Sequence, residues 1–262
     1  MKIVVTVKLV PDANAEKRLD PATKTLDRQP GATVLNPFDE YAIEAALQLK
    51  EKLGGDTTVT VFSMVPETGK ETVRKALAMG ADDAAMLSDP GLAGTDVWGT
   101  AYAMAHALKK IGFDLVITGG LAEDGNTGGV PCALAEHLGI PALTNAAKID
   151  IVDGKLHIQR ETDSGHQVVQ GPLPAVVSVT MAVGEPRYPS LKGIMGAKKK
   201  TVTALTLADL GLERPVGSAG AKTEVLSFAP PPSRAKGQIV TAEDGPSGAK
   251  IIFDFLKEKK LI

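Results

Sequence analysis

Residues 114–139 read DLVITGGLAEDGNTGGVPCALAEHLG and contain three consecutive patterns. The apolar run at 114–120 predicts a buried strand, residues 121–129 predict a glycine-rich loop, and residues 130–139 predict a helix. In an open parallel sheet such a loop lies at the carboxyl ends of the strands, where ligands bind, and a helix N-terminus favours an anion. The loop is neither a Walker motif nor an ordered G-x-G-x-x-G. Two interpretations therefore stay open, a phosphate-binding loop and a plain strand-to-helix turn.

The same alternation of strand and helix extends toward the N-terminus. The expected strands are 3–10, 57–64 and 84–87, and the expected helices are 36–53, 67–80 and 95–111. Residues 12–35, which are rich in Asp, Pro, Gly and Thr, form either a small hairpin or a long surface loop. Alternation from residue 3 to residue 139 predicts an α/β fold with a mostly parallel open sheet flanked by helices.

The pattern changes after Pro141. Residues 148–161 alternate around Asp153-Gly154, which predicts a β-hairpin insertion, and residues 174–183 predict a further strand. A linker rich in Pro and Gly then precedes an amphipathic helix at the end of the sequence. We therefore predict an α/β domain at 1–205, which includes the segment 185–200, and a linker with a C-terminal helix at 206–262; the resemblance described below implies that the first is nucleotide-binding and the second an extended arm.

The composition excludes several classes of function. The 262 residues carry 29 Lys and Arg against 31 Asp and Glu, a net charge of −2, so nucleic-acid binding is not expected. The single Cys132 and four scattered His offer no disulfide, metal-ligand spacing or catalytic triad, and Cys132 is expected to be a small core residue. The apolar run at the N-terminus ends at Pro11, too early to span a bilayer. We expect a soluble cytoplasmic protein without a metal.

Four residues at predicted element ends are candidates for ligand contacts. Asn36 and Pro37 are explained by capping of the helix that follows, because Asn accepts from free N–H groups and Pro suits the first helical position. Phe38 places an aromatic ring in the first turn, at the edge where a ligand would bind. Met64 ends a strand at the same edge, although a core position is more typical of methionine.

The segment EPRYPSLKGIMGAKKK, residues 185–200, combines apolar residues with a lysine cluster. Leu191, Ile194 and Met195 form either an exposed docking loop or a contact with their own domain, with the lysines at a solvated edge. The residues alone do not decide between these two interpretations.

Several motifs, in order and along essentially the whole chain, resemble the beta subunits of electron transfer flavoproteins, the family that includes the FixA proteins. The stretch IQRETDSGHQVVQGPLPAVVS at 158–178 is similar to the family signature, with Ser164 at a position where an acid or glycine is expected. The other matching motifs are VKLVPD (7–12), NPFDEYAIEAALQLKE (36–51), ETVRKALAMGAD (71–82), DGNTGGVPCALAEHLGIP (124–141) and EPRYPSLKGIMGAKKK (185–200).

The resemblance implies a heterodimer in which an alpha subunit holds the redox-active FAD. The beta subunit would have an adenine nucleotide alpha hydrolase-like fold and bind AMP in a structural role. It would dock acyl-CoA-type dehydrogenases, whose electrons pass on toward a quinone reductase, and its C-terminal arm would reach across the alpha subunit. The implied docking residues are Leu191, Ile194 and Met195. The implied nucleotide contacts are Thr6, Asn36, Pro37, Phe38, Asp39, Met64, Asp124, Gly125, Asn126, Thr127, Gly128, Gly129, Val130 and Pro131.

Two alternatives remain beside this interpretation. Electron-bifurcating members of the family hold a second FAD where others hold AMP, but Gly119-Gly120 and residues 124–127 depart from the pattern of many of these members, which favours AMP. A stand-alone adenine-nucleotide-binding module or enzyme would use the same sheet. An enzyme of that kind would have a pyrophosphate-binding loop after the first strand, and VTVKLVPDANA contains none.

Overall fold

The computed structural model describes residues 1–15, 17–28, 33–229, 232–233, 236–237 and 239–262. The chain divides into two compact units, Met1–Leu226 and Ser227–Ile262, and each is described by itself. The predicted arm was expected to begin at residue 206, whereas the first unit extends to Leu226. The difference has a packing cause, since Leu210 and Val216 are buried in the core of the first unit.

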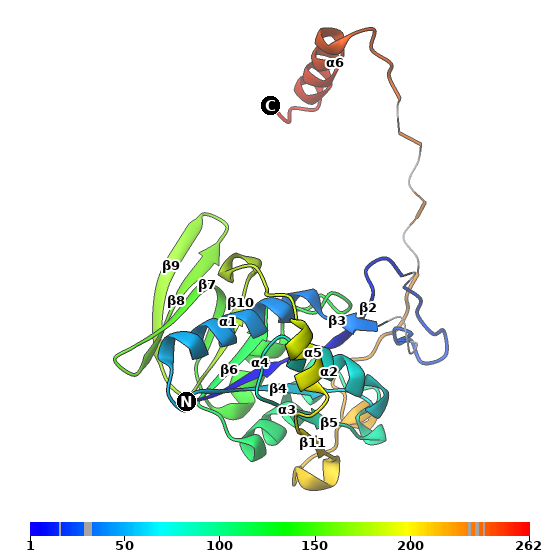
Figure 1. Ribbon diagram of the computed structural model, residues 1–262. Helices are drawn as coiled ribbons and strands as arrows, with labels where there is room; N and C mark the ends of the chain where they lie inside the picture. Colours follow the sequence, from blue (N-terminus) through cyan, green and yellow to red (C-terminus); the bar gives the residue numbers. More distant parts are fainter. Residues whose placement is uncertain (16, 29–32, 230–231, 234–235, 238) are drawn as a thin grey trace. The chain divides into compact units, whose positions relative to one another are not determined.

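The first unit is built on one nine-stranded sheet in the order β11-β5-β4-β1-β6-β10-β7-β8-β9 (Figure 1). Neighbouring strands are parallel from β11 to β7, while β8 and β9 continue the sheet in antiparallel pairing. This confirms the predicted α/β class. The strands are β1 (Lys2–Thr6), β4 (Thr58–Met64), β5 (Asp83–Leu87), β6 (Leu115–Gly119), β7 (Ala142–Val152), β8 (Lys155–Thr162), β9 (Gly165–Pro172), β10 (Ala175–Val179) and β11 (Val202–Leu205).

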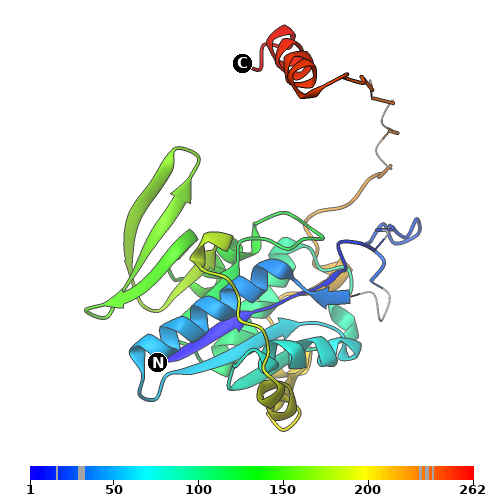
Figure 2. The ribbon, with the colours of Figure 1, turned by 45° about the horizontal axis from the view of Figure 1, so that its top comes forward.

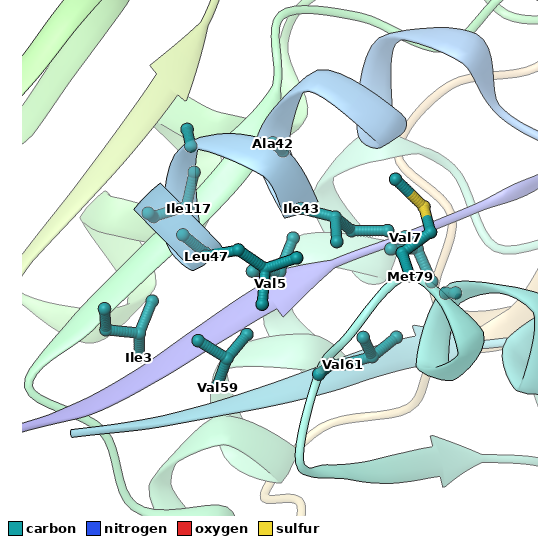
Figure 3. Close-up of a cluster of buried hydrophobic side chains, with 14 of the residues drawn as sticks. Ile3, Val5, Val7, Ala42, Ile43, Leu47, Val59, Val61, Met79 and Ile117 are labelled. Atoms are coloured by element: carbon teal, nitrogen blue, oxygen red, sulfur yellow. The ribbon is translucent and has the colours of Figure 1, made fainter. Parts of the chain in front are cut away.

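Helices cover both faces of the sheet (Figure 2). One face carries α1 (Pro37–Leu53), α2 (Lys70–Ala78) and α5 (Leu191–Ala197), and the other carries α3 (Val97–Ile111) and α4 (Val130–Leu138). Successive side chains of a strand point to opposite faces, so Ile3 and Val5 of β1 pack under α1 (Figure 3). Val4 belongs to the core on the other face, with residues of α3 and α4. Burial of each such side chain contributes about 1.5–3 kcal/mol.

The strand expected at 3–10 is two strands in the structure. After β1 the chain leaves the sheet, and β2 (Leu9–Pro11) pairs antiparallel with β3 (Thr33–Leu35). The segment 12–35 therefore ends in β3, whose partner strand β2 precedes the segment. Residues 16 and 29–32 of this segment lie outside the described residues.

The hairpin predicted around Asp153-Gly154 is present as β7 and β8, but it continues into β9, which the sequence pattern missed. Most residues of β9 are exposed, so its sequence lacks the alternating apolar positions that mark a half-buried strand. The edge strand β11 was missed because it is short and half exposed.

The order of the strands creates a switch point at the centre of the sheet. The chain runs from β1 outward through β4 and β5, then returns to place β6 on the other side of β1. The connections that follow β1 and β6 therefore leave the sheet in opposite directions. Open α/β sheets bind ligands at the carboxyl ends of two such strands.

The second unit contains one helix, α6 (Gly245–Glu258), within its described residues. Asp244 caps it by accepting from the Ser247 N–H at 2.8 Å, and the Ser247 hydroxyl accepts from the Asp244 N–H at 3.1 Å. Its apolar side chains Ile252, Phe253 and Phe255 are more than half exposed. Among the helices that the structure describes, none combines the length and the hydropathy needed to cross a bilayer.

Candidate ligand-binding site

A cavity of about 880 Å³ opens at the switch point of the sheet. The carboxyl ends of β1, β4 and β6 reach it through Thr6, Met64 and Thr118. Nine of the predicted contact residues line this cavity: Thr6, Asn36, Asp39, Met64, Gly125, Thr127, Gly128, Val130 and Pro131. Five others, Pro37, Phe38, Asp124, Asn126 and Gly129, are not in its lining. The ligand edge expected from the sequence is therefore a real concavity, although the expected ring of Phe38 is not part of its wall.

The glycine-rich loop between β6 and α4 turns through two residues with positive φ, Asn126 at 49° and Gly128 at 59°. Gly128 needs no side chain to reach this conformation, and its place in the cavity wall exposes backbone rather than side chain. No side chain caps α4, so its first N–H groups remain available to an anion. Cys132, expected in the core, is instead exposed on the outer side of α4.

The predicted role of Asn36 as a helix cap is wrong. Its side chain makes no cap hydrogen bond to α1. The amide Nδ2 donates to the carbonyl oxygen of Leu121 at 2.9 Å, and Oδ1 accepts from the Glu123 N–H at 3.0 Å. Asn36 is 1 % exposed, so these two bonds fix the start of the glycine-rich loop to the start of α1 from inside the protein.

Asp39 lies at the base of the cavity in the first turn of α1. Its Oδ2 accepts from the Lys8 N–H at 2.7 Å, and the Gly119 N–H also donates to the carboxyl group. The side chain leaves almost no room for β6, because a Cβ added at Gly119 would collide with the Asp39 carboxylate. Burial raises the pKa of Asp39 to about 7, although these hydrogen bonds and the Lys8 ammonium oppose that rise.

The titration of Asp39 predicts a pH-dependent stability. Because the folded-state pKa is above its ordinary value of 3.8, the folded state binds the proton more tightly. The free energy of unfolding then falls as pH rises through the window from about 4 to about 7. Asp39→Asn removes this effect, and we expect the stability of the wild type relative to the variant to fall by about 2 kcal/mol between pH 5 and pH 8.

Urea unfolding at several pH values measures this difference. Asp209→Asn is the matched control, because hydrogen bonds from Thr206 lower the pKa of the exposed Asp209 and place its titration below this window. A wild-type to Asp39→Asn difference that does not change with pH contradicts the assignment.

Asp124 belongs to the glycine-rich loop but does not line the cavity. Its carboxylate forms ion pairs with two cations. The Lys8 Nζ lies 2.8 Å from Oδ1, and the Arg28 guanidinium donates to Oδ2 at 2.5 and 3.1 Å. The side chain of Asp124 is fully buried between them, and, although burial raises its pKa, the bonds from Lys8 and Arg28 bring the pKa below its usual value. Lys8 and Arg28 also line the cavity, so two cations that share one carboxylate place positive charge in the cavity wall beside the loop.

Another part of the cavity wall combines the start of α3 with residues from the end of the first unit. Asp96 caps α3 by accepting from the Gly99 N–H at 2.9 Å through Oδ1. Its Oδ2 accepts from the N–H groups of Lys222 at 2.8 Å and Thr223 at 3.1 Å, and from the Thr223 hydroxyl at 3.1 Å. We call residues 222–225 the strap, because Thr223 and Val225 line the cavity. The Asp96 carboxylate thus links the strap to the N-terminus of α3 at the cavity wall.

The docking residues expected at 185–200 are largely exposed. Leu191 is 82 % exposed, Met195 is 71 % exposed and Ile194 is 46 % exposed, so packing against their own domain is not their role. They are not part of the cavity lining and belong to α5. Among the described residues, no group of three or more His, Cys, Asp or Glu is arranged to hold a metal ion.

Four residues of the site were not found from the sequence. Lys8 follows the first strand, and its place at the ligand edge was a usable signal. Asp96 directly precedes an apolar helical pattern, which identifies an N-cap but not a cavity wall. Arg28 and Thr223 reach the site from segments without periodicity, and only the folded chain brings them there.

The chain is similar over its length to a known family of proteins. A family model described as "Electron transfer flavoprotein domain" matches residues 23–210. The electron transfer flavoprotein subunit beta of Mycobacterium tuberculosis (strain ATCC 25618 / H37Rv) is 46 % identical over 265 residues, 99 % of each chain. That of Thermoanaerobacterium thermosaccharolyticum is 40 % identical over 243 residues, 92 % of each chain. Subunit CarD of the caffeyl-CoA reductase-Etf complex of Acetobacterium woodii is 36 % identical over 264 residues, all of each chain.

Proposed function

Because the chain belongs to the family of electron transfer flavoprotein beta subunits, we propose that it binds AMP structurally in the cavity at the switch point. A beta subunit of this family forms an electron transfer complex with an alpha subunit. The redox chemistry belongs to an FAD held mainly by the alpha subunit, which accepts electrons from acyl-CoA-type dehydrogenases and passes them toward a quinone reductase. The beta subunit helps to shape that flavin site, docks the dehydrogenases through α5 and contributes no catalytic residue.

The fit of the cavity to a nucleoside monophosphate supports the AMP proposal. The single observation that carries it is an uncapped helix N-terminus behind a glycine-rich loop at the carboxyl edge of the sheet. Gly125 and Gly128 would let the backbone approach a phosphate, and Thr127 would supply a hydroxyl. The ammonium of Lys8 lies 4.0 Å from a Cβ added at Gly125, so its positive charge is close to the proposed phosphate position.

Cofactor content tests the proposal directly. The heterodimer with its alpha subunit is purified and denatured, and the released small molecules are separated by chromatography. One FAD and one AMP per heterodimer is the expected result. Two FAD without AMP would overturn it in favour of an electron-bifurcating beta subunit. The chain expressed without an alpha subunit is the second arm, in which a stable, nucleotide-loaded homodimer would favour a stand-alone nucleotide-binding module.

The strap predicts how the nucleotide is retained. Asp96→Ala removes the acceptor of three strap hydrogen bonds and the cap of α3, so the strap opens more often. We expect AMP to leave the heterodimer about tenfold faster, which corresponds to about 1.4 kcal/mol. The release rate is measured by exchange of labelled AMP against excess unlabelled AMP.

Asp89→Ala provides a matched control for the strap. Asp89 also caps a turn, by accepting from the Gly91 N–H at 2.8 Å, and also holds a later segment, by accepting from the Leu207 N–H at 3.1 Å. Neither Asp89 nor Leu207 lines the cavity. Equal release rates in the Asp96 and Asp89 variants would show that the strap does not retain the nucleotide.

A further inference from the structure

One arginine holds the chain before α5 to α1. The Arg187 guanidinium donates to the two carboxylate oxygens of Glu44 at 2.7 and 3.0 Å, and the Arg187 backbone N–H donates to Oε2 at 3.1 Å. Gln48 donates to Oε1 at 2.9 Å. Glu44 is 4 % exposed, so a buried carboxylate is satisfied by a forked arginine and by the backbone of the same residue. Glu51, a largely exposed residue, accepts from Nη1 of the same guanidinium at 2.6 Å and from Nη2 at 3.3 Å.

The helix α5 itself rests on the C-terminal end of α2 (Figure 1). A Cβ added at Gly193 would collide with the carbonyl oxygen of Ala78, so the two helices meet at a distance that only glycine permits. Arg74 of α2 donates to the carbonyl oxygens of Ala197 at 3.2 Å and Lys198 at 3.0 Å. The segment is therefore attached at Arg187, at Gly193 and at its C-terminal end.

Three large side chains between or beside these attachments have almost no contact with the rest of the chain. Tyr188 is 90 % exposed, and Leu191 and Met195 are nearly as exposed. We call Tyr188, Leu191 and Met195 the docking surface. The seven residues of α5 are too few to hold a helix in water without tertiary support. The orientation of the docking surface must therefore come from the attachments.

We propose that Glu44, Arg187 and Gly193 are positioning residues that hold the docking surface in one orientation before a dehydrogenase arrives. The proposal rests on the proposed docking function of α5. Without the attachments α5 would sample several orientations, and the apparent affinity would fall by the fraction of molecules in the competent one. The partner is a protein with an apolar pocket, because the exposed ring of Tyr188 and the exposed apolar side chains of Leu191 and Met195 would leave water when they enter one.

The first test replaces Arg187, whose guanidinium binds both carboxylate oxygens of Glu44. Arg187→Met leaves Glu44 buried without its charge partner, whereas Arg187→Lys keeps the positive charge but loses the two-pronged geometry. With purified heterodimer, we expect KM for an acyl-CoA dehydrogenase to rise about tenfold in Arg187→Met and by a smaller factor in Arg187→Lys. Glu51→Gln is the control, since its exposed pair with Arg187 is worth little, and we expect less than a twofold change.

The second test uses two glycines of the same helix. Gly193→Ala forces α5 away from α2, whereas a Cβ added at Gly196 meets nothing within 4 Å. Both changes raise helix propensity equally, so propensity cannot explain a difference between them. We expect a raised KM for Gly193→Ala and an unchanged KM for Gly196→Ala. This pair keeps the proposal testable if an Arg187 variant folds poorly.

Two further measurements separate positioning from general damage. Reduction by dithionite, nucleotide content and heterodimer size should be unchanged in all variants, while amide hydrogen exchange should increase in residues 188–197 of Arg187→Met and Gly193→Ala. Leu191→Ala is measured in parallel. A normal KM in Leu191→Ala would refute the docking function itself. A raised KM in Leu191→Ala with normal KM in Arg187→Met and Gly193→Ala would overturn the positioning proposal alone.

Discussion

Gly119→Ala is expected to destabilise the protein by about 3 kcal/mol and to remove its bound nucleotide. The added methyl group would collide with the Asp39 carboxylate and would lie 2.9 Å from the Phe38 carbonyl oxygen. The second contact is with backbone, so no rotation of a side chain relieves it. Either β6 or the start of α1 must move, and small-to-large changes in a close-packed site typically cost about 1–3 kcal/mol, more where backbone must shift.

The loss of nucleotide follows from the place of the collision. Gly119 and Asp39 both line the cavity, and Asn36 ties the start of α1 to the glycine-rich loop. A shift of α1 therefore displaces the loop as well. Chemical denaturation measures the stability, and chromatography of the released small molecules measures the content of AMP.

Gly125→Ala is the control for this prediction. A Cβ at Gly125 would meet only the Lys8 Nζ at 4.0 Å, so the same added methyl group has room there. We expect the stability of Gly125→Ala to differ from the wild type by less than about 1 kcal/mol. If Gly119→Ala were as stable as Gly125→Ala, the contact between α1 and β6 would not be the close one described.

Leu191→Ala is expected to slow electron acceptance from the dehydrogenase by about thirtyfold while heterodimer assembly and cofactor content stay intact. The side chain is almost fully exposed, so its removal costs the folded chain little. A central anchor of a protein interface contributes about 2 kcal/mol or more, and about 2 kcal/mol corresponds to this factor. Stopped-flow reduction of the heterodimer by a substrate-reduced dehydrogenase measures the rate.

Val168→Ala provides the matched control. Val168 lies on β9 and is 79 % exposed, so it resembles Leu191 in chemistry and exposure but belongs to another surface. We expect its rate to be normal. A normal rate in Leu191→Ala would remove the docking assignment from α5, and an equal loss in both variants would point to a nonspecific effect.

The α/β class was predictable because apolar runs such as those of β1, β4 and β6 alternate along the chain with amphipathic helices. Ile3 and Val4 illustrate the reason. Helices cover both faces of the sheet, so adjacent residues of a central strand are both buried and both apolar. The strand β9 was not predicted, because its exposed residues, such as Val168, show no alternation of apolar and polar positions. Backbone pairing with β8 places it, and pairing depends on the partner strand rather than on its own side chains.

The site was predictable in its location and only partly in its contacts. Asn36 shows the limit, because Asn before Pro is explained locally by capping, while its actual partners lie 85 and 87 residues away along the chain. Local sequence patterns report local hydrogen bonds and are silent about distant ones. Thr223 is a similar case, since nothing in its own segment indicates a cavity.

Lys8 serves two carboxylates with two different parts of its structure. The backbone N–H donates to Asp39 at 2.7 Å, and the ammonium donates to Asp124 at 2.8 Å. An alanine scan would remove the ammonium, and with it the pair with Asp124 and a charge that acts on Asp39, but alanine keeps the N–H. Such a scan would therefore overlook the backbone hydrogen bond to the buried acid. Replacement of the amide by an ester, through chemical synthesis or semisynthesis, is the substitution that separates the two roles.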